Sequence, residues 1–298
     1  TVLPASKVLY LALPPLFPLL AEELGVGFAA LGLVVMAYNL VGGLLQGPVG
    51  ILVDRLGARH VLLAGLGLNA AAIAAMGFSE GYWPLVFLAL MAGIGNSVFH
   101  PADYSILSGS VSAGRAARAH SIHTFSGFFG GALAPLTMIA LATLLGWRAA
   151  FVLIGVVGIA MTAMLWFGSD LLRGEGELHR AKSEAAGKSG APLSAFLSTP
   201  IVLGFLFFAA YGAASGSLYA FSTTLLTKLH GSDLAEANTV LTASQVVLSL
   251  GVLLGGWLAD RNGNSIGVLT WLAIVMAVFG SASLALTSAW PLLLVCVL

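Results

Sequence analysis

The chain has 298 residues and no net formal charge, and 8% of its residues are charged while 59% are hydrophobic. Soluble domains carry about 25% charged residues, so this composition, with a mean hydropathy of +1.00, excludes an ordinary soluble protein. No basic stretch interleaved with aromatic residues is present, which argues against nucleic-acid binding, and the single cysteine, Cys296, excludes an intrachain disulfide.

Long stretches without Asp, Glu, Lys or Arg follow one another along the chain. A helix needs about 20 residues to cross roughly 30 Å of hydrocarbon, and only helices satisfy their backbone polar groups within one segment. Each stretch therefore predicts one membrane helix, which gives nine helices and, after Pro291, the start of a tenth. The stretches cover residues 8–21, 24–53, 60–79, 81–102, 119–147, 149–169, 189–227, 237–259 and 262–298. The first stretch is short, the chain begins without Met, and the last stretch has no polar end. We therefore expect a fragment of an all-α, polytopic membrane protein.

One long polar stretch, residues 170–192, divides the first six predicted helices from the rest. Its charges of mixed sign lie among Gly, Ala and Ser and cannot be buried, so the stretch is expected to be a solvated linker. The sequence thus predicts a six-helix bundle over residues 1–170 with a truncated first helix, a cytoplasmic linker over 171–195, and a partial second bundle over 196–298.

The distribution of Lys and Arg among the loops predicts the orientation in the membrane. Cytoplasmic loops retain positive charges, and one set of alternate loops holds nearly all of them. The N-terminus is therefore expected in the cytoplasm, with Glu22, Glu23 and Glu80 outside. The residues assigned to the cytoplasmic side are Arg55, Arg59, Arg115, Arg118, Arg173, Arg180, Lys182, Lys188 and Arg261, and the outer loops hold Arg148 and Lys228.

A short motif occurs twice, at the polar ends of two apolar stretches. The first copy has Gly50, Asp54, Arg55 and Gly57, with Arg59 following, and the second copy ends in Asp260, Arg261 and Gly263. Such a repeat in two halves of a membrane protein is typical of duplicated transporters. Glycine permits a tight turn, and Asp54 can cap or pair with a neighbouring helix end, so we interpret the motif as a gate latch. The alternative is that these charges only fix the topology.

These residues resemble the cytoplasmic signature of the major facilitator superfamily, and Gly146-Trp147-Arg148-Ala149-Ala150-Phe151 resembles a further element of that family. The resemblance implies two six-helix halves that rock around a central site. It also implies that Asp54 engages cytoplasmic helix ends in one conformation, with Arg115 as a partner.

Within that superfamily, residues 37–40, 46–48 and 99–103 are most similar to the fosmidomycin-resistance group of efflux proteins. Asp103 stands where that group usually has Glu. This finer resemblance covers mainly the second to fifth predicted helices.

Ionisable groups inside the membrane are the candidates for function, since a central charge costs at least about 2.5–3.5 kcal/mol. Asn96, His100 and Asp103 are spaced to share a helix face, and Pro101 should bend that helix. We expect Asp103 and His100 to carry a coupling proton. The alternative is that Asp103 caps a helix end and His100 packs at the bend.

Several other polar residues are candidates for coupling or solute binding. Lys7, His120 and His123 lie in the cytoplasmic third, although Lys7 and His120 can also snorkel to the interface. Tyr211 and Gln245 can hydrogen-bond a solute in a central cavity or join helices to one another.

Three classes of function are compatible with these features. We favour a proton-coupled secondary transporter of a small organic solute, a drug or metabolite exporter, with organic-anion uptake as its variant. A membrane metal site on His100, Asp103, His120 and His123 and a non-transporting sensor are the alternatives. No nucleophile elbow, phosphate-binding loop or His-Glu-x-x-His motif occurs, so neither an enzyme nor a cofactor is expected. The expected partners are the solute, protons and the lipid of a bacterial inner membrane, with the protein acting as a monomer.

Overall fold

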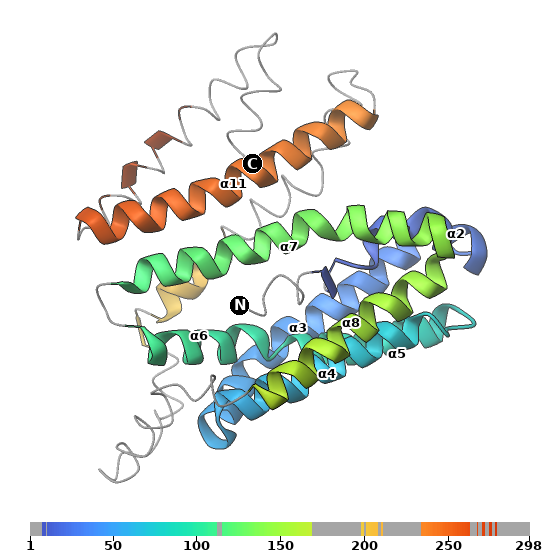
Figure 1. Ribbon diagram of the computed structural model, residues 1–298, viewed down its shortest axis with the longest axis horizontal. Coiled ribbons are helices and arrows are strands. Elements are labelled where there is room, and N and C mark those ends of the chain that lie inside the picture. Colours follow the sequence, from blue (N-terminus) through green and yellow to red (C-terminus); the bar gives the residue numbers. More distant parts are fainter. Residues whose placement is uncertain are drawn as a thin grey trace. The chain divides into compact units, whose positions relative to one another are not determined.

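The computed structural model describes residues 8–9, 11–111, 115–168, 198–199, 201–207, 210, 234–262, 267, 270–271, 274–275 and 278. Its regular elements in this part of the chain are all helices (Figure 1). The chain divides into two compact units, Thr1–Ala186 and Gly187–Leu298. The boundaries predicted at 170/171 and 195/196 stay a prediction, because residues 169–197 lie outside the described residues.

Unit 1 contains one 3-10 helix and seven α-helices among its described residues. Five segments are long and apolar enough to cross a membrane, namely α3, α4, α7, α8 and the combined segment Tyr82–Leu107. The predicted all-α, polytopic fold is thereby confirmed. The elements are η1 Pro14–Leu16, α2 Phe17–Leu24, α3 Phe28–Leu56, α4 Ala58–Met76, α5 Tyr82–Asn96, α6 Phe99–Ser110, α7 Ala116–Leu145 and α8 Trp147–Phe167.

In unit 2 the structure describes one long helix, α11, Leu234–Asn262. It covers the stretch 237–259 that the sequence predicted to be a membrane helix, with three further residues at each end. Residues 201–207 are also helical. Most of the predicted helices at 189–227 and 262–298 lies outside the described residues.

Two predicted helices are interrupted, and proline accounts for both interruptions. The stretch 8–21 was predicted to be one helix, which is wrong, because Pro14 and Pro15 begin the 3-10 turn η1 and α2 follows with Pro18 in its first turn. Proline has no N–H and its ring disfavours a preceding helical turn, so helices tend to start at it.

The helix predicted at 81–102 is divided into α5 and α6. The amide of Ser97 is bonded to the carbonyls of Gly93, at 3.0 Å, and Ile94, at 3.2 Å. Pro101 cannot donate to the carbonyl of Ser97, so the helical ladder lacks a bond at this point. Helix α6 then continues to Ser110, beyond the predicted end, and carries Asp103 inside the segment that can cross the membrane.

Helix α4 packs against α5 on one side and α8 on the other, and small residues make both contacts close. A Cβ added at Gly95 of α5 would lie 2.5 Å from the amide nitrogen of Asn69 and 2.6 Å from the carbonyl oxygen of Gly65. A Cβ added at Gly155 of α8 would lie 2.5 Å from the Cβ of Ala74. Membrane helices associate through such close packing, because lipid offers no hydrophobic drive.

A buried amide joins three helices in the same region. The Nδ2 of Asn69 on α4 donates to the hydroxyl of Tyr38 on α3, at 3.0 Å, and to the carbonyl of Ala92 on α5, at 2.8 Å. Asn69 is fully buried. Hydrogen bonds between membrane helices contribute about 0.6 kcal/mol each, and they also fix which helix faces meet.

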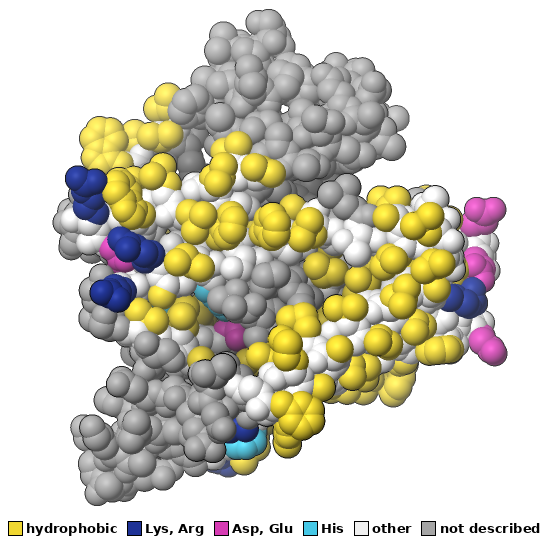
Figure 2. All heavy atoms as spheres, in the orientation of Figure 1, with side chains coloured by type: hydrophobic (Ala, Val, Ile, Leu, Met, Phe, Trp, Pro, Cys, Tyr) yellow, Lys and Arg dark blue, Asp and Glu magenta, His cyan; other side chains and the backbone are white. Residues whose placement is uncertain are grey.

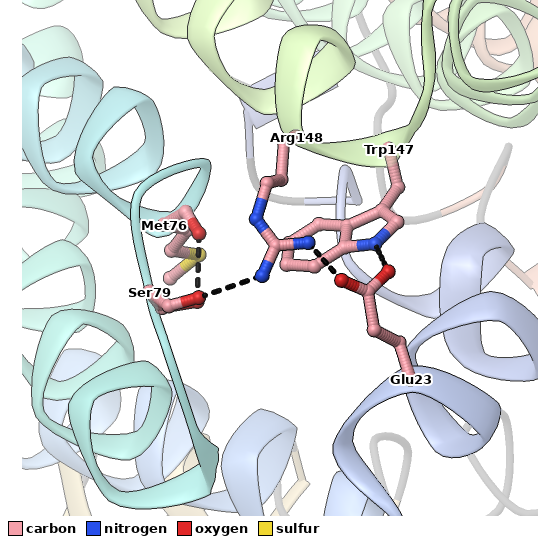
Figure 3. A network of polar contacts seen from close by, with 5 residues as sticks. All are labelled: Glu23, Met76, Ser79, Trp147 and Arg148. Atoms are coloured by element: carbon pink, nitrogen blue, oxygen red, sulfur yellow. Dashed lines mark hydrogen bonds and ion pairs between the residues drawn. The ribbon is translucent and has the colours of Figure 1, made fainter.

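A polar network lies at the end of unit 1 where α2 ends and α8 begins (Figure 3). The Glu23 carboxylate accepts hydrogen bonds from the indole Nε1 of Trp147 and from the Arg148 guanidinium. Arg148 also donates to the carbonyl of Ser79, at 3.3 Å, and lies over the Trp147 ring at 4.2 Å. These contacts tie α2, the loop after α4 and the start of α8 together.

The bonds from Trp147 and then Arg148 hold the pKa of Glu23 below its ordinary value. A carboxylate that accepts charge-assisted bonds is stabilised in its ionised form. The sequence placed Glu23 and Arg148 on the outer side of the membrane but did not pair them.

Exposed apolar side chains cover the visible flank of unit 1, and charged side chains gather at its ends (Figure 2). Among the exposed residues are Leu44, Trp83, Phe87, Leu144 and Phe167. A soluble monomer rarely exposes so much apolar surface, whereas a membrane protein presents it to lipid or to neighbouring helices.

Replacing Gly95 by Ala should lower the melting temperature of the purified full-length protein, since the added methyl group pushes α4 and α5 apart. Overpacking of this kind costs about 1–3 kcal/mol. The matched control is Gly43→Ala on α3, where an added Cβ meets no described atom within 4 Å. Equal melting temperatures for the two variants would contradict the close contact between α4 and α5.

Glu23→Gln should lower the melting temperature at pH 7 by about 2 °C, because the amide loses the charge-assisted bonds to Trp147 and Arg148. A carboxyl with a lowered pKa stabilises the folded state above its ordinary pKa of 4.5, and this contribution is lost as the pH falls through the lowered value. Wild type and variant should therefore converge at strongly acidic pH. Glu22→Gln is the control, one residue away, and a pH-independent difference for Glu23→Gln would contradict the assignment.

Candidate functional site

A buried carboxylate and a buried imidazole meet between α6 and α7. The Oδ2 of Asp103 lies 3.7 Å from the Nε2 of His123, and the two side chains are 9% and 7% exposed. Both helices belong to segments that can cross a membrane. The distance is within ion-pair range but longer than a hydrogen bond, so a small movement of either helix would bring the two atoms into hydrogen-bonding contact.

From helical spacing we predicted that Asp103 pairs with His100 on the same helix. In the structure, the ion-pair contact of Asp103 is with His123 on the neighbouring helix. His100 stacks on the ring of Tyr104, with centroids 5.7 Å apart. The rings of His120 and His123 also contact Tyr104, at 5.4 and 5.9 Å. The four sequence candidates Asp103, His100, His120 and His123 thus lie in one cluster around a tyrosine that the sequence analysis did not select.

The position of Tyr104 in the sequence already predicts its contact with His100. Tyr104 is four residues after His100, so the two side chains share a helix face, and it directly follows Asp103. The contacts with His120 and His123 depend on how α6 and α7 rotate toward each other, and a single sequence does not carry that information.

The metal-site alternative required His100, Asp103, His120 and His123 to converge on one point. Across the residues that the structure describes, no group of three His, Cys, Asp or Glu side chains is placed to hold a metal ion. The histidines contact the tyrosine ring face or edge instead.

Of the remaining solute candidates, Asn96 is described and the others lie outside the described residues or have side chains outside them. Asn96 ends α5 and faces α3, because a Cβ added at Gly42 would lie 3.5 Å from its Nδ2. Lys7 and Tyr211 lie outside the described residues. Gln245 belongs to α11, and its side chain is not among those described.

The loop between α3 and α4, which belongs to the predicted latch, consists of one residue. Gly57 alone separates α3 from α4, with φ 87° and ψ 140°, and its amide donates to the carbonyl of Val53 at 2.9 Å. Positive φ strongly favours glycine, which explains the residue at this turn. Gly50 has no such role within the described residues, because an added Cβ there would meet no atom within 4 Å.

The charged residues of the latch lie at this end of unit 1. Asp54 and Arg55 are exposed and Arg59 is partly buried. Arg115, the expected partner of Asp54, is exposed immediately before α7, and the structure shows no ion pair between these two described residues. In the second copy, Asp260 and Arg261 lie in the last turn of α11, and the Arg261 guanidinium is 5.1 Å from the Trp257 ring centroid.

Comparison with known proteins gives a family and several relatives. The model of the Major Facilitator Superfamily matches residues 8–298. The fosmidomycin resistance protein of Escherichia coli K12 is 25% identical over 253 residues, with 84% of this chain and 61% of that protein covered. The D-galactonate transporter of Escherichia coli O6:H1 is 26% identical over 271 residues, with 83% of this chain and 62% of that protein covered. The chain thus spans about three fifths of the length of these two relatives.

A solved structure has the same fold. It is the crystal structure of a bacterial homologue of the human lysosomal transporter Spinster, in an inward-facing and unoccupied conformation. The two structures are similar with a TM-score of 0.62 at 18% identity, and the match covers 99% of this chain and 70% of the other. At this identity the likeness shows the fold alone.

Proposed function

The chain belongs to the major facilitator superfamily, and on this basis we propose that the protein is a secondary active transporter that exports a small organic solute in exchange for protons. The membership confirms the family predicted from the duplicated motif. It is a family of transporters and not of enzymes, and the fosmidomycin resistance protein is among the relatives. Transport would proceed by rocking of two helical halves around a central site.

The contact between Asp103 and His123 is the single observation that carries proton coupling. A charged carboxylate inside the membrane is costly, so such a residue is retained for ion or proton pathways in most membrane proteins. An imidazole exchanges protons near neutral pH. When the cytoplasmic side opens, water would reach the pair and the proton would leave. When that side closes, water would leave the pair again. Each cycle of opening and closing would thereby be coupled to the movement of a proton.

The relatives support two classes of cargo. Export of a drug-like compound is favoured by the fosmidomycin resistance protein. Uptake of an organic anion is the second candidate, favoured by the D-galactonate transporter and by the imidazoles near Asp103, which attract an anion when they are protonated. Fosmidomycin and D-galactonate are therefore the first two solutes to test.

The topology supports the proposed orientation, a bacterial inner membrane with the N-terminus in the cytoplasm. Successive helices place the latch loop and the start of α7 at one end of unit 1, and the ends of α2 and α4 at the other. The first end is rich in arginine and the second in glutamate, which matches the retention of positive charge on the cytoplasmic side. Residues 1–170 and 196–298 would then be the two halves, and we propose that the protein acts as a monomer.

Asp103→Asn should abolish accumulation of solute against its gradient and leave exchange of solute for solute intact, because exchange needs rocking without net proton transfer. Full-length protein in liposomes is given an imposed pH gradient, and labelled fosmidomycin or D-galactonate is followed. His123→Asn should have the same effect as Asp103→Asn. His100→Asn is the comparison, and it should retain accumulation if His123 is the partner. Undiminished accumulation by Asp103→Asn would contradict proton coupling at this residue.

Asp54→Asn should slow the transport cycle about tenfold without reducing expression or solute binding, because the residue biases a conformational equilibrium and does not touch solute. Initial rates of exchange and equilibrium binding of the transported probe are measured on the same preparation. Glu80→Gln, an acidic residue at the opposite end of unit 1, is the control. Wild-type exchange rates for Asp54→Asn would count against a gating role.

A further inference from the structure

The ring of Tyr104 contacts every imidazole of α6 and α7. Its centroid is 5.7 Å from that of His100, with the planes 27° apart. It is 5.4 Å from that of His120 and 5.9 Å from that of His123, with interplanar angles of 62° and 56°. Inclined aromatic contacts at these distances are attractive and restrict the rotation of both rings. One side chain of α6 therefore holds the two imidazoles of α7.

Tyr104 is more exposed than the buried pair beside it. Counted over the whole residue, Tyr104 is 44% exposed, whereas Asp103 and His123 are 9% and 5% exposed. Because the ring of Tyr104 contacts that of His123, it covers part of the imidazole against solvent.

The geometry of the pair makes the position of the imidazole important. Between Oδ2 of Asp103 and Nε2 of His123 the distance is 3.7 Å, so the proton is not shared in this conformation. Asp103 and Tyr104 move together on the short helix α6, while His123 belongs to α7. A shift of α6 relative to α7 therefore changes two things together, the distance between Asp103 and His123 and the contact of the Tyr104 ring with His123.

Other charged groups near α6 lie at the helix ends. Helices α3 and α4 also pack against α6. Their charged or imidazole side chains are Asp54, Arg55, Arg59 and His60, in the last turn of α3 and the first turn of α4. On α7 the remaining charge is Arg118, in the first turn. Within the described interior of α6 and α7, the imidazole within ion-pair range of Asp103 is that of His123.

We propose that Tyr104 is the positioning residue of the coupling site: its ring holds the His123 imidazole toward Asp103 and keeps water from the pair until α6 moves. This inference rests on the proposed proton coupling. It assigns the role to the aromatic ring and not to the hydroxyl group, so phenylalanine should replace tyrosine without loss.

The test measures the accessibility of individual histidines to diethyl pyrocarbonate, which modifies exposed imidazoles and needs no transported solute. Full-length wild type, Tyr104→Phe and Tyr104→Leu are labelled, and modification of each histidine is followed by mass spectrometry. In Tyr104→Leu, His123 should be modified at least about twofold faster, as expected from the strength of a lost inclined ring contact. In Tyr104→Phe its rate should equal that of wild type. His60, an exposed residue of α4, should react at one rate in all three proteins.

A second readout links this role to coupling. Tyr104→Leu should accumulate less fosmidomycin or D-galactonate under an imposed pH gradient while exchange of the same probe continues, and Tyr104→Phe should accumulate it as wild type does. Phe129→Leu, which removes a half-exposed ring from α7, is the matched control for the loss of an aromatic side chain. Tyr104→Met replaces Tyr104→Leu if the latter does not fold.

Unchanged labelling of His123 in Tyr104→Leu would overturn the positioning role, and so would equal defects in Tyr104→Phe and Tyr104→Leu. Either result would leave the proposed function standing. Failure of the proposed function has a separate signature, namely full accumulation by Asp103→Asn, whatever the labelling of His123.

Discussion

The exclusion of water from the hydrocarbon region is the constraint on which the rest of this structure depends. Without water, each apolar stretch must satisfy its backbone N–H and C=O groups internally, which a helix does. Every polar side chain inside the membrane likewise needs a hydrogen-bonding or charged partner. Asn69 meets this demand in part, because its Nδ2 bonds α3 and α5 from its position on α4 while its buried Oδ1 accepts no hydrogen bond. Asp103 meets it incompletely, at 3.7 Å from His123. The two groups differ in chemistry, because the amide of Asn69 has no proton to exchange, whereas the carboxyl of Asp103 can change its protonation state.

The same constraint explains which parts of the fold the sequence predicted. Stretches without charge located α3, α4, α7, α8 and α11, because membrane thickness fixes the length of a spanning helix. The interruptions were not predicted in detail. Pro14 and Pro15 divide the first stretch and Pro101 divides the fourth, but whether a membrane proline breaks or only bends a helix depends on the neighbours that satisfy the freed carbonyl.

The site was predicted in its residues but not in its pairing. Asp103, His100, His120 and His123 were selected because ionisable groups are rare in membrane helices. Helical spacing within α6 suggested His100 as the partner, since a single sequence reports neighbours along a helix and not across an interface. The contact with His123 arises from the rotation of α6 against α7. That rotation also brings Tyr104 against both imidazoles of α7, and no pattern in either helix alone encodes it.

The two ends of unit 1 are built differently, and the difference bears on the rocking proposed above. At one end, Glu23, Trp147, Arg148 and the backbone of Ser79 join three elements in one network (Figure 3). At the other end, α3 and α4 are joined through Gly57, and Asp54 is exposed with no ion pair to Arg115 among the described residues. A unit that is fixed at one end and held by close glycine contacts along α4 can rotate as a whole, while an uncommitted carboxylate at the other end is available to form a contact in another state. Helix α6 lies toward this second end, is separated from α5 at Ser97 and Val98, and packs against α3 and α4, the two helices that flank the latch. Because α6 carries both Asp103 and Tyr104, the latch and the proton site would be coupled through the displacement of one short helix.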